Sequence, residues 1–431
     1  MKRSLLLLVL VGAVARGQEA SPATNATPEA RPLGLRPFLA EVEKTNLDLA
    51  ANRFNIPIAE AQIAIAKVFP DPEVSGGLSP LNDQGAPLTV SVGLSQTIEL
   101  GGKRGARIEE ANRGKSLAEA QLEDFFQNLR VSAANAFIDA LAAREALDRK
   151  RKTLESVEKL VAANEQRLRA GDIGHAALLQ VKVEADRFRA DVISAEADVR
   201  TADYALDLFL GGPGAGSVPR VRPLGSLRLP PKSYDADALV AGALERRSDL
   251  VATLRAQEQA EAHVRLAHAN RWIDLNLGAD WSRTNAASGQ FATIAPSPQF
   301  DGFGVSVGFP LPFSRLLHGE LDAAKAAAKQ AETQSLSARR RVEIEVLQAL
   351  ARYDATRRSV NLYTGDVLSN ADSVLEAMRY SYERGAARLI ELIDAQRTVD
   401  DVYLSYIGAL AANAKALVAL ERAGAIWDLD F

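Results

Sequence analysis

Few side chains in this sequence have the types and spacing that catalysis or metal binding requires. The chain has no cysteine and four histidines. His263 and His268 are five residues apart, which on a helix separates them by about 140°, a poor arrangement for binding one metal ion. His175 and His318 are isolated. No Ser-His-Asp pattern or phosphate-binding loop is present, so we expect no catalytic residues, no resident metal and no cofactor.

Two carboxylates, Glu391 and Asp394, stand three residues apart in a segment that starts at Gly385. On a helix this spacing puts both side chains on the same face. From the spacing alone, an ordinary solvated face and a functional acidic pair are equally open. The choice depends on the elements that position the pair.

The bulk composition limits the class of protein. Of 431 residues, 47% are hydrophobic, 25% are charged and only 6% are aromatic, and alanine is abundant. This mixture favours long helices with small-residue packing. The net charge of −4 gives no reason to expect a nucleic-acid partner.

The first residues have the character of an export signal. Lys2 and Arg3 precede an apolar run at 5–14, and small residues follow in the positions that a signal peptidase requires. Cleavage would leave Arg16 or Gln18 as the first residue of the mature chain. The run is too short to span a membrane. Because no cysteine is present, we expect attachment to a membrane without a lipid anchor.

The chain is a duplicated unit. The sequence Val-Ser-Val-Gly occurs at 90–93 and again at 305–308. The spacing from Gly171 to Leu178 is repeated from Gly385 to Leu392. Such self-similarity indicates two copies of one structural repeat. The predicted organisation is a signal peptide at 1–17, a disordered segment at 18–34, a first repeat at 35–211, a Pro/Gly-rich linker at 212–235, a second repeat at 236–425 and a tail at 426–431.

Each repeat is predicted to read helix, two strands, very long helix, turn and helix. In the first repeat the helical segments cover roughly 35–68, with a kink or break at Pro57, then 104–169 and 176–210. A helix of about 65 residues is on the order of 100 Å long. Apolar residues recur every seven positions along it, as in a coiled coil. The second repeat continues this series at Val346, Tyr353, Val360, Val367 and Val374.

The helices alone fit a periplasmic coiled-coil rod as well as a tube, and the strands decide between them. Three segments of about nine residues alternate between apolar and polar side chains, the signature of transmembrane β-barrel strands. A weaker fourth strand covers 74–79. Four strands cannot close a barrel, whereas three copies would supply twelve around an aqueous lumen. The residues predicted to face lipid are Leu88, Val90, Val92, Leu94, Leu275, Leu277, Val305 and Val307.

With these features in place, the sequence resembles the TolC-type outer-membrane efflux ducts. The resemblance covers both repeats and rests on the duplicated architecture, the paired glycine turns and the segment Gln-Thr-Ile-Glu-Leu-Gly-Gly-Lys-Arg at 96–104. That segment is similar to the branch serving heavy-metal pumps, which export cobalt, zinc, cadmium, copper or silver ions. The resemblance implies a homotrimer with a mainly α-helical fold and transmembrane β-strands. Its β-barrel would lie in the outer membrane, and its helical barrel would project into the periplasm.

The resemblance also implies partners and site residues. The family narrows its pore near the helical tips, with acidic residues that fall on Glu391 and Asp394 and a tyrosine that falls on Tyr382. The polar residues that hold the pore of the family closed correspond to Ala177 and Ala387 in this chain. Alanine cannot make these polar contacts, so this part of the family pattern does not carry over. The partners are an inner-membrane pump of the resistance-nodulation-division type and a periplasmic adaptor, which would meet the tips at Arg169, Gly171, Gly174, Arg384, Gly385 and Arg388.

The predicted function is therefore the passive exit of heavy-metal cations from a pump and adaptor through the outer membrane. Two alternatives stay open. A duct for drug efflux or type I protein secretion would share everything except the segment 96–104. A non-pore periplasmic scaffold would share the helices but would leave the alternating strands unexplained.

Overall fold

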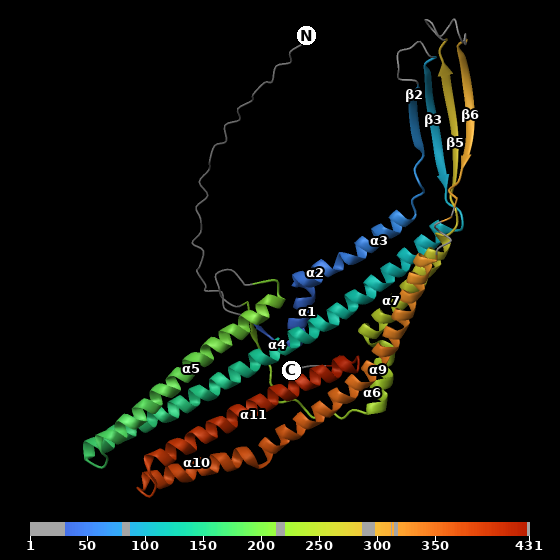
Figure 1. Ribbon diagram of the computed structural model, residues 1–431. Helices are drawn as coiled ribbons and strands as arrows, with labels where there is room; N and C mark the ends of the chain where they lie inside the picture. The colour runs from blue at the N-terminus through green and yellow to red at the C-terminus, as the bar shows by residue number, and fades with distance from the viewer. Residues whose placement is uncertain are drawn as a thin grey trace, which may run out of the picture.

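The computed structural model describes residues 31–79, 87–212, 220–286, 298–311, 313 and 318–428. Figure 1 shows a long rod of helices with one sheet at its upper end and two helical turns at the other end. The fold is mainly helical, as predicted. The predicted signal peptide and most of the segment at 18–34 lie outside the described residues.

Both repeats follow the predicted order along the rod. The first consists of α1 (Leu35–Thr45), α2 (Leu47–Arg53), α3 (Asn55–Ala66), β2 (Glu73–Ser79), β3 (Thr89–Ile98), α4 (Lys103–Ala170) and α5 (His175–Phe209). The second consists of α6 (Ala236–Arg246), α7 (Ser248–Ala269), β5 (Leu275–Thr284), β6 (Phe300–Gly308), α9 (Gly319–Leu362), the π-helical turn η1 (Tyr363–Val367), α10 (Leu368–Glu383) and α11 (Leu389–Ala423).

The first helical segment breaks twice, once at a polar cap and once just before its proline. Asn46 ends α1, and its side-chain oxygen accepts a hydrogen bond of 2.8 Å from the backbone N–H of Leu49, which caps α2. A second break falls at Phe54. This break lies directly before Pro57, which occupies the first turn of α3, where a missing N–H costs no helical hydrogen bond.

The long helix of the first repeat is unbroken. α4 has 68 residues and contains no proline. Glycines in the left-handed conformation stand at both ends, Gly102 with φ of 73° and Gly171 with φ of 85°. Other residues rarely adopt this conformation, so the two glycines define where the helix begins and ends.

The seven-residue series holds only along part of the second repeat. Val346 and Tyr353 are buried, but Val374 is 53% exposed. Between them η1 makes a wider turn, and the extra residue rotates the following positions away from the packed stripe. Within a single chain, the packed part of the series therefore ends before Val374.

One antiparallel sheet joins the two repeats, in the order β2-β3-β5-β6. β3 of the first repeat pairs directly with β5 of the second, with Val92 opposite Trp281. On the far side of β5, Trp281 lies opposite Phe303 of β6. The four predicted strands are thus present in the described part of the chain.

A small parallel sheet was not predicted. β1 (Arg31–Leu33) pairs with β4 (Val221–Pro223), which lies inside the inter-repeat linker. Val221 and Leu227 of the linker are fully buried. The prediction of disorder is wrong for residues 31–33, because pairing with β4 satisfies their backbone groups. The described part of the linker packs on the rod.

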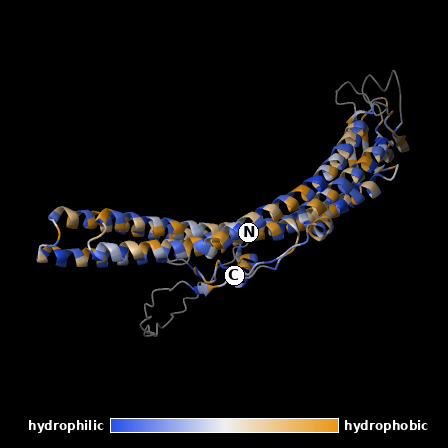
Figure 2. Cartoon of the chain, turned by 90° about the horizontal axis from the view of Figure 1, so that it is seen from below, coloured by the Kyte–Doolittle hydropathy of each residue, from blue (hydrophilic) through white to orange (hydrophobic). Residues whose placement is uncertain are grey.

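The main hydrophobic core lies where both repeats meet along the rod. Phe38 and Phe137 contribute rings whose centres are 5.5 Å apart. Among the described helices, α11 is long and apolar enough to cross a membrane, but half of its most apolar stretch is buried inside the protein. Figure 2 shows hydrophobic and hydrophilic residues interleaved along the whole rod.

Candidate functional site

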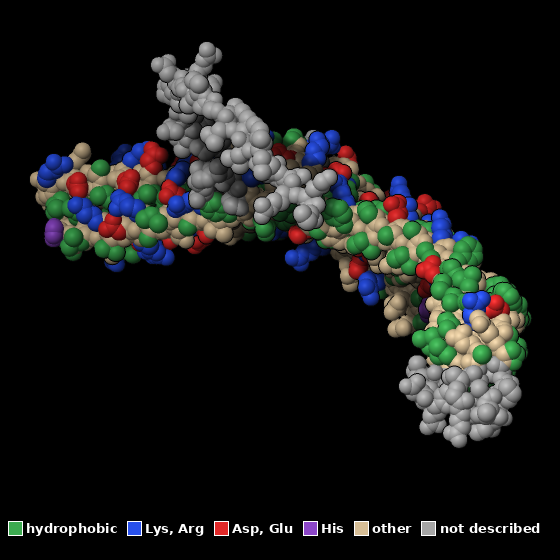
Figure 3. Space-filling model, turned by 90° about the horizontal axis from the view of Figure 1, so that it is seen from above, with side chains coloured by type: hydrophobic (Ala, Val, Ile, Leu, Met, Phe, Trp, Pro, Cys, Tyr) green, Lys and Arg blue, Asp and Glu red, His purple; other side chains and the backbone are tan. Residues whose placement is uncertain are grey.

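The sheet has an apolar face. Residue rows cross all four strands, and one of them is Val74, Leu94, Ala279 and Val305. Val305 and Phe303 are each 87% exposed, so the described chain leaves this face open. Figure 3 shows hydrophobic side chains gathered at this end of the molecule. The face contains Val90, Val92, Leu94, Leu275, Leu277, Val305 and Val307 in register, and Leu88 directly precedes β3.

The opposite face of the sheet is polar and small, apart from Phe300 at its outer end. One of its rows is Ser75, Gly93, Asp280 and Gly304. A Cβ at Gly304 would lie 2.5 Å from a carboxylate oxygen of Asp280, so the glycine provides the room that this carboxylate occupies. Glu73 and Asp280 are the charged residues on this face within the paired, described strands, and both are acidic.

Both edges of the sheet are open. In the described chain β2 pairs only with β3, and β6 pairs only with β5. The outer backbone groups of β2 and β6 therefore lack strand partners, which invites pairing with another chain. Towards its outer end the apolar face carries an ion pair between Arg283 and Asp301 at 2.8 Å.

The segment 96–104 forms the joint between β3 and α4. Gly101 has φ of 71°, and a Cβ there would lie 2.3 Å from the ring of Trp272. Lys103 is only 5% exposed, and its Nζ lies 2.6 Å from a carboxylate oxygen of Asp274. Because Asp274 lies between α7 and β5, this ion pair ties the joint of the first repeat to that of the second.

The same joint holds the chain that enters β2. Gln96 donates a hydrogen bond of 2.8 Å to the carbonyl of Pro70, and Arg104 donates one of 2.8 Å to the carbonyl of Lys67. Arg107 donates to the carbonyl of Val68 at 3.2 Å. The segment that resembles the heavy-metal branch is thus accounted for by the strand-to-helix transition.

The six predicted adaptor-contact residues lie at the two helical turns. Gly171 ends α4, and Gly174 caps α5 with an extended backbone. Arg169 is exposed in the last turn of α4. In the second repeat Arg384 and Gly385, with φ of 75°, follow α10, and Arg388 caps α11. The structure therefore brings all six residues to one end of the rod (Figure 1).

Glu391 and Asp394 share one exposed face of α11, as their spacing predicts. A carboxylate oxygen of Glu391 accepts a hydrogen bond of 2.8 Å from the backbone N–H of Arg388, which closes the first turn of the helix. Asp394 lies 3.6 Å from the guanidinium of Arg397. Among the described residues no three histidine or acidic side chains are grouped to bind a metal ion.

Tyr382 does not share that face. Its ring is buried beside Leu389 and Leu392, and its hydroxyl hydrogen-bonds to the side-chain oxygen of Asn164 in α4. The guanidinium of Arg167 lies 5.0 Å from the centre of the ring. Tyr382 therefore connects the tips of two helical hairpins, one formed by α4 and α5 and the other by α10 and α11. Sequence reasoning missed Asn164, although a fully buried asparagine in a long amphipathic helix must find a polar partner.

A cavity of about 310 Å³ lies between the two hairpins near their tips. Lys159 and Arg167 of α4 line it, together with Arg379 of α10. Glu184 of α5 also lines it and accepts a hydrogen bond of 2.8 Å from Arg397 of α11. This hydrogen bond holds the pKa of Glu184 below its ordinary value, so the pair links the hairpins at neutral pH.

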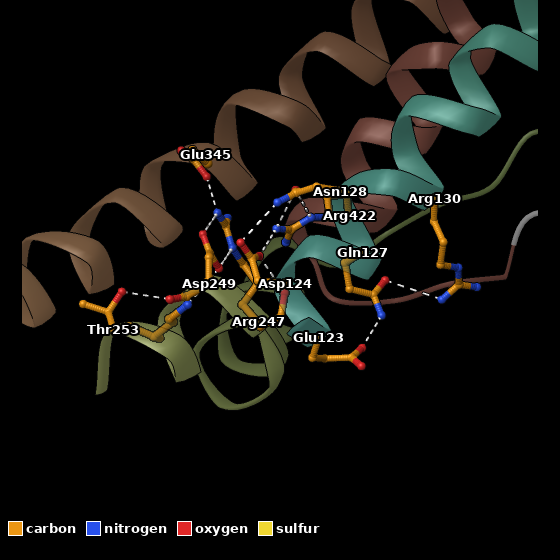
Figure 4. A network of polar contacts seen from close by, with 12 residues as sticks. Glu123, Asp124, Gln127, Asn128, Arg130, Arg247, Asp249, Thr253, Glu345 and Arg422 are labelled. Carbon is orange, nitrogen blue, oxygen red and sulfur yellow. Dashed lines mark hydrogen bonds and ion pairs between the residues drawn. The ribbon is translucent and has the colours of Figure 1, made fainter. Parts of the chain in front are cut away.

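A second polar network lies nearer the sheet and joins both repeats (Figure 4). Arg247 is 5% exposed and pairs with Asp249 at 2.7 Å and also with Glu345 of α9. Arg422 of α11 contacts Asp124 of α4 at 2.8 Å. Burial opposes ionisation of Asp249, but its hydrogen bond and attraction to Arg247 prevail and lower its pKa. The network fixes α4, α7, α9 and α11 relative to one another.

Comparison with known proteins agrees with this architecture. The family model for outer membrane efflux proteins matches residues 39–212 and 239–424, one match in each repeat. The chain belongs to the outer membrane efflux protein family. Members of this family are efflux channels, so this chain is an outer-membrane efflux channel component that extends into the periplasm.

Individual relatives span nearly the whole chain. The cobalt-zinc-cadmium resistance protein CzcC of Cupriavidus metallidurans is 26% identical over 91% of this chain and 90% of its own. The cation efflux system protein CusC of Escherichia coli K12 is 23% identical over 85% and 80% of the two chains. The crystal structure of CusC superposes with a TM-score of 0.72 and covers 90% of this chain and 91% of its own. That of the Campylobacter jejuni channel CmeC superposes with a TM-score of 0.73 and covers 90% of this chain and 85% of its own.

Proposed function

We propose that three copies of this chain form a passive duct whose sheets close into a barrel in the outer membrane. The observation that carries the proposal is a two-faced sheet with two open edges. Three sheets of four strands make twelve, and a closed ring removes every edge that lipid would leave unpaired. The apolar face then meets lipid and the polar face lines water.

The helical tips serve as the contact with a periplasmic adaptor, which connects the duct to an inner-membrane pump of the resistance-nodulation-division type. Two features support this. The tip turns expose Arg169, Arg384 and Arg388 to a partner, and the cavity between the hairpins lies beside them. In the trimer, Glu391 and Asp394 would place six carboxylates around the periplasmic mouth, and Tyr382 would hold the second hairpin against the first.

The cargo we propose is heavy-metal cations. CzcC and CusC are named for cobalt, zinc and cadmium resistance and for cation efflux. The charged residues on the polar face, Glu73 and Asp280, are acidic, as are Glu391 and Asp394 at the tip. Acidic rings attract cations and repel anions. The chain acts as a conduit without catalysis.

Two measurements test the proposal. The mass of the purified complex in detergent should correspond to three chains, and a stable monomer would contradict it. Cells lacking the protein should become sensitive to cobalt, zinc, cadmium, copper or silver, and the wild-type chain should restore growth. Sensitivity confined to drugs would favour a duct for drug efflux, and loss of secretion of a protein would favour a duct for type I secretion. A protein that does not insert into the membrane would favour a periplasmic scaffold.

A further inference from the structure

A cavity of about 530 Å³ lies at the joint between the sheet and the helices. Residues 68–72 form one wall, and residues 96–99 with Arg104 form the other. The hydrogen bonds from Gln96 to Pro70 and from Arg104 to Lys67 hold the two walls together. The cavity is therefore built into the joint, and it lies where the sheet meets α4 (Figure 1).

Two opposite charges line this cavity, and each is available for a ligand. The guanidinium of Arg104 stacks 4.2 Å from the ring centre of Phe69 and donates to a carbonyl. Within the described chain neither Arg104 nor Asp71 forms an ion pair. Glu99, the other acidic residue in the lining, is already paired with Arg107 at 2.7 Å.

The cavity also borders the apolar face of the sheet. Ile98 lies opposite Leu275 in the last row of that face and is 40% exposed. Across the cavity, Val68 and Phe69 are 57% and 64% exposed. Exposed apolar side chains thus adjoin an arginine and an aspartate at one level of the molecule, as expected at a membrane–water boundary.

We propose that this cavity binds a zwitterionic phospholipid headgroup with a primary ammonium, the chemistry of phosphatidylethanolamine. The phosphate would lie on Arg104, with Lys67 adding positive charge nearby. The ammonium would donate to the carboxylate of Asp71, and the acyl chains would run along Ile98 and the apolar face. The inference rests on the proposed function, because it requires the sheet to lie in a bilayer.

Two features of the lining select this lipid. A quaternary ammonium, as in phosphatidylcholine, cannot donate a hydrogen bond to Asp71. Phosphatidylglycerol offers no cation for Asp71, whose carboxylate would then face the headgroup unpaired. The joint, which carries the connection between the membrane and the periplasmic rod, would in this way gain a lipid ligand that fixes its depth in the periplasmic leaflet.

Native mass spectrometry of the purified trimer, titrated with each lipid, tests the proposal. Phosphatidylethanolamine should bind more tightly than phosphatidylglycerol or phosphatidylcholine. Arg104→Ala should weaken its binding by about tenfold, the usual effect of losing one charge-assisted hydrogen bond. Asp71→Asn, which removes no ion pair or side-chain hydrogen bond found among the described residues, should remove the preference for phosphatidylethanolamine over phosphatidylglycerol. Arg340→Ala, at an exposed arginine of α9, should bind as the wild type does.

Three outcomes would overturn the lipid site. The first is an unchanged lipid preference in Asp71→Asn. The second is equal loss of binding in Arg104→Ala and Arg340→Ala. The third is displacement of the lipid by comparable concentrations of water-soluble glycerophosphoethanolamine, which would indicate a headgroup site without lipid. If the wild-type chain does not insert into vesicles at all, the proposed barrel itself fails, and this result is distinct from the other three.

Discussion

The two repeats build the same hairpin from different helices. In the first, α4 runs unbroken for 68 residues. In the second, α9 has 44 residues and is joined to α10, which has 16, by the five-residue π turn η1. Gly365 lies in η1, and a Cβ added there would meet no other atom within 4 Å, so that side of the turn faces open space.

The hydroxyl of Thr364 bonds to the carbonyl of Val360 at 3.3 Å, beside the wider turn. Turns of this kind mark places where a helix bends or serves a function. We infer that the hairpin of α10 and α11 is the movable one, while α4 and α5 are the fixed support. The tips differ in charge as well: Glu391 and Asp394 in the second repeat correspond to Ala177 and Gln180 in the first.

A single aligned position shows the same asymmetry near the sheet. Asn46 in the first repeat and Arg247 in the second both stand before the second helix of their repeat. Asn46 caps α2 locally and donates to the carbonyl of Phe209 at 3.1 Å. Arg247 instead reaches Asp249 and Glu345. The second repeat therefore depends on a buried arginine with two partly exposed carboxylates, where the first uses a neutral cap.

The largest expected effect follows from that position. Arg247→Ala should destabilise the chain by about 2–3 kcal/mol, because it removes the charge-assisted hydrogen bonds from a buried guanidinium to Asp249 and Glu345. Asn46→Ala should cost about 1 kcal/mol, the usual loss for a helix cap. Denaturant unfolding measures both. Equal costs at the two positions would break the comparison between the repeats.

The same variant has a pH signature. The folded pKa of Asp249 is depressed, so its ion pair contributes stability that is fully present above the unfolded pKa. That stability is lost as the pH falls through the folded pKa. The wild type should therefore lose more stability on acidification than Arg247→Ala does, as measured by unfolding at neutral and at acidic pH. Parallel losses in the two proteins would contradict the role of Arg247.

The sheet offers a test in which the repeats should behave alike. Val92→Lys in the first repeat and Val305→Lys in the second should each impair membrane assembly by about 2–4 kcal/mol if they lie near the midplane. Ser91→Lys and Ser306→Lys face the polar side and should be tolerated. The yield of heat-resistant trimer in membranes measures all four. Equal sensitivity of valine and serine positions would show that the lipid face is misassigned.

A smaller effect is expected at the π turn. Gly365→Ala should raise the free energy of unfolding by up to about 1 kcal/mol, since alanine favours helix over glycine and the site has room for a Cβ. Hydrogen exchange along α10 should slow more than exchange along α4. Gly408→Ala, at an equally open site in α11, is the control. If hydrogen exchange along α10 slows equally in both variants, η1 is not the pivot of the α10–α11 hairpin.

The last effect concerns conduction, and the trimer should still assemble. Replacing Glu391 and Asp394 with alanine should reduce cation selectivity and block by multivalent cations in planar-bilayer recordings, because the acidic ring at the mouth is removed. The control removes two exposed carboxylates of α6, Asp237 and Glu245. Unchanged selectivity in the tip variant would mean that these residues do not line the constriction.

Local patterns predicted much of this fold. The strands were found because apolar and polar residues alternate at the pleat period, as at Val90 and Ser91. The long helices were found because their apolar positions recur and their ends carry glycines such as Gly171. The cap at Asn46 and the π turn before Val374 were not predicted, because both depend on backbone geometry that residue type alone does not specify.

The sequence by itself determined which elements form and which side chains share a face, since both depend on residues only a few positions apart. The tertiary structure alone decided the contacts across repeats. Tyr382 with Asn164 and Lys103 with Asp274 are distant in sequence, and neither pair has a periodic signal. Their partners are chosen by how long helices and strands pack, because a buried polar group must bond to whatever the neighbouring element places beside it.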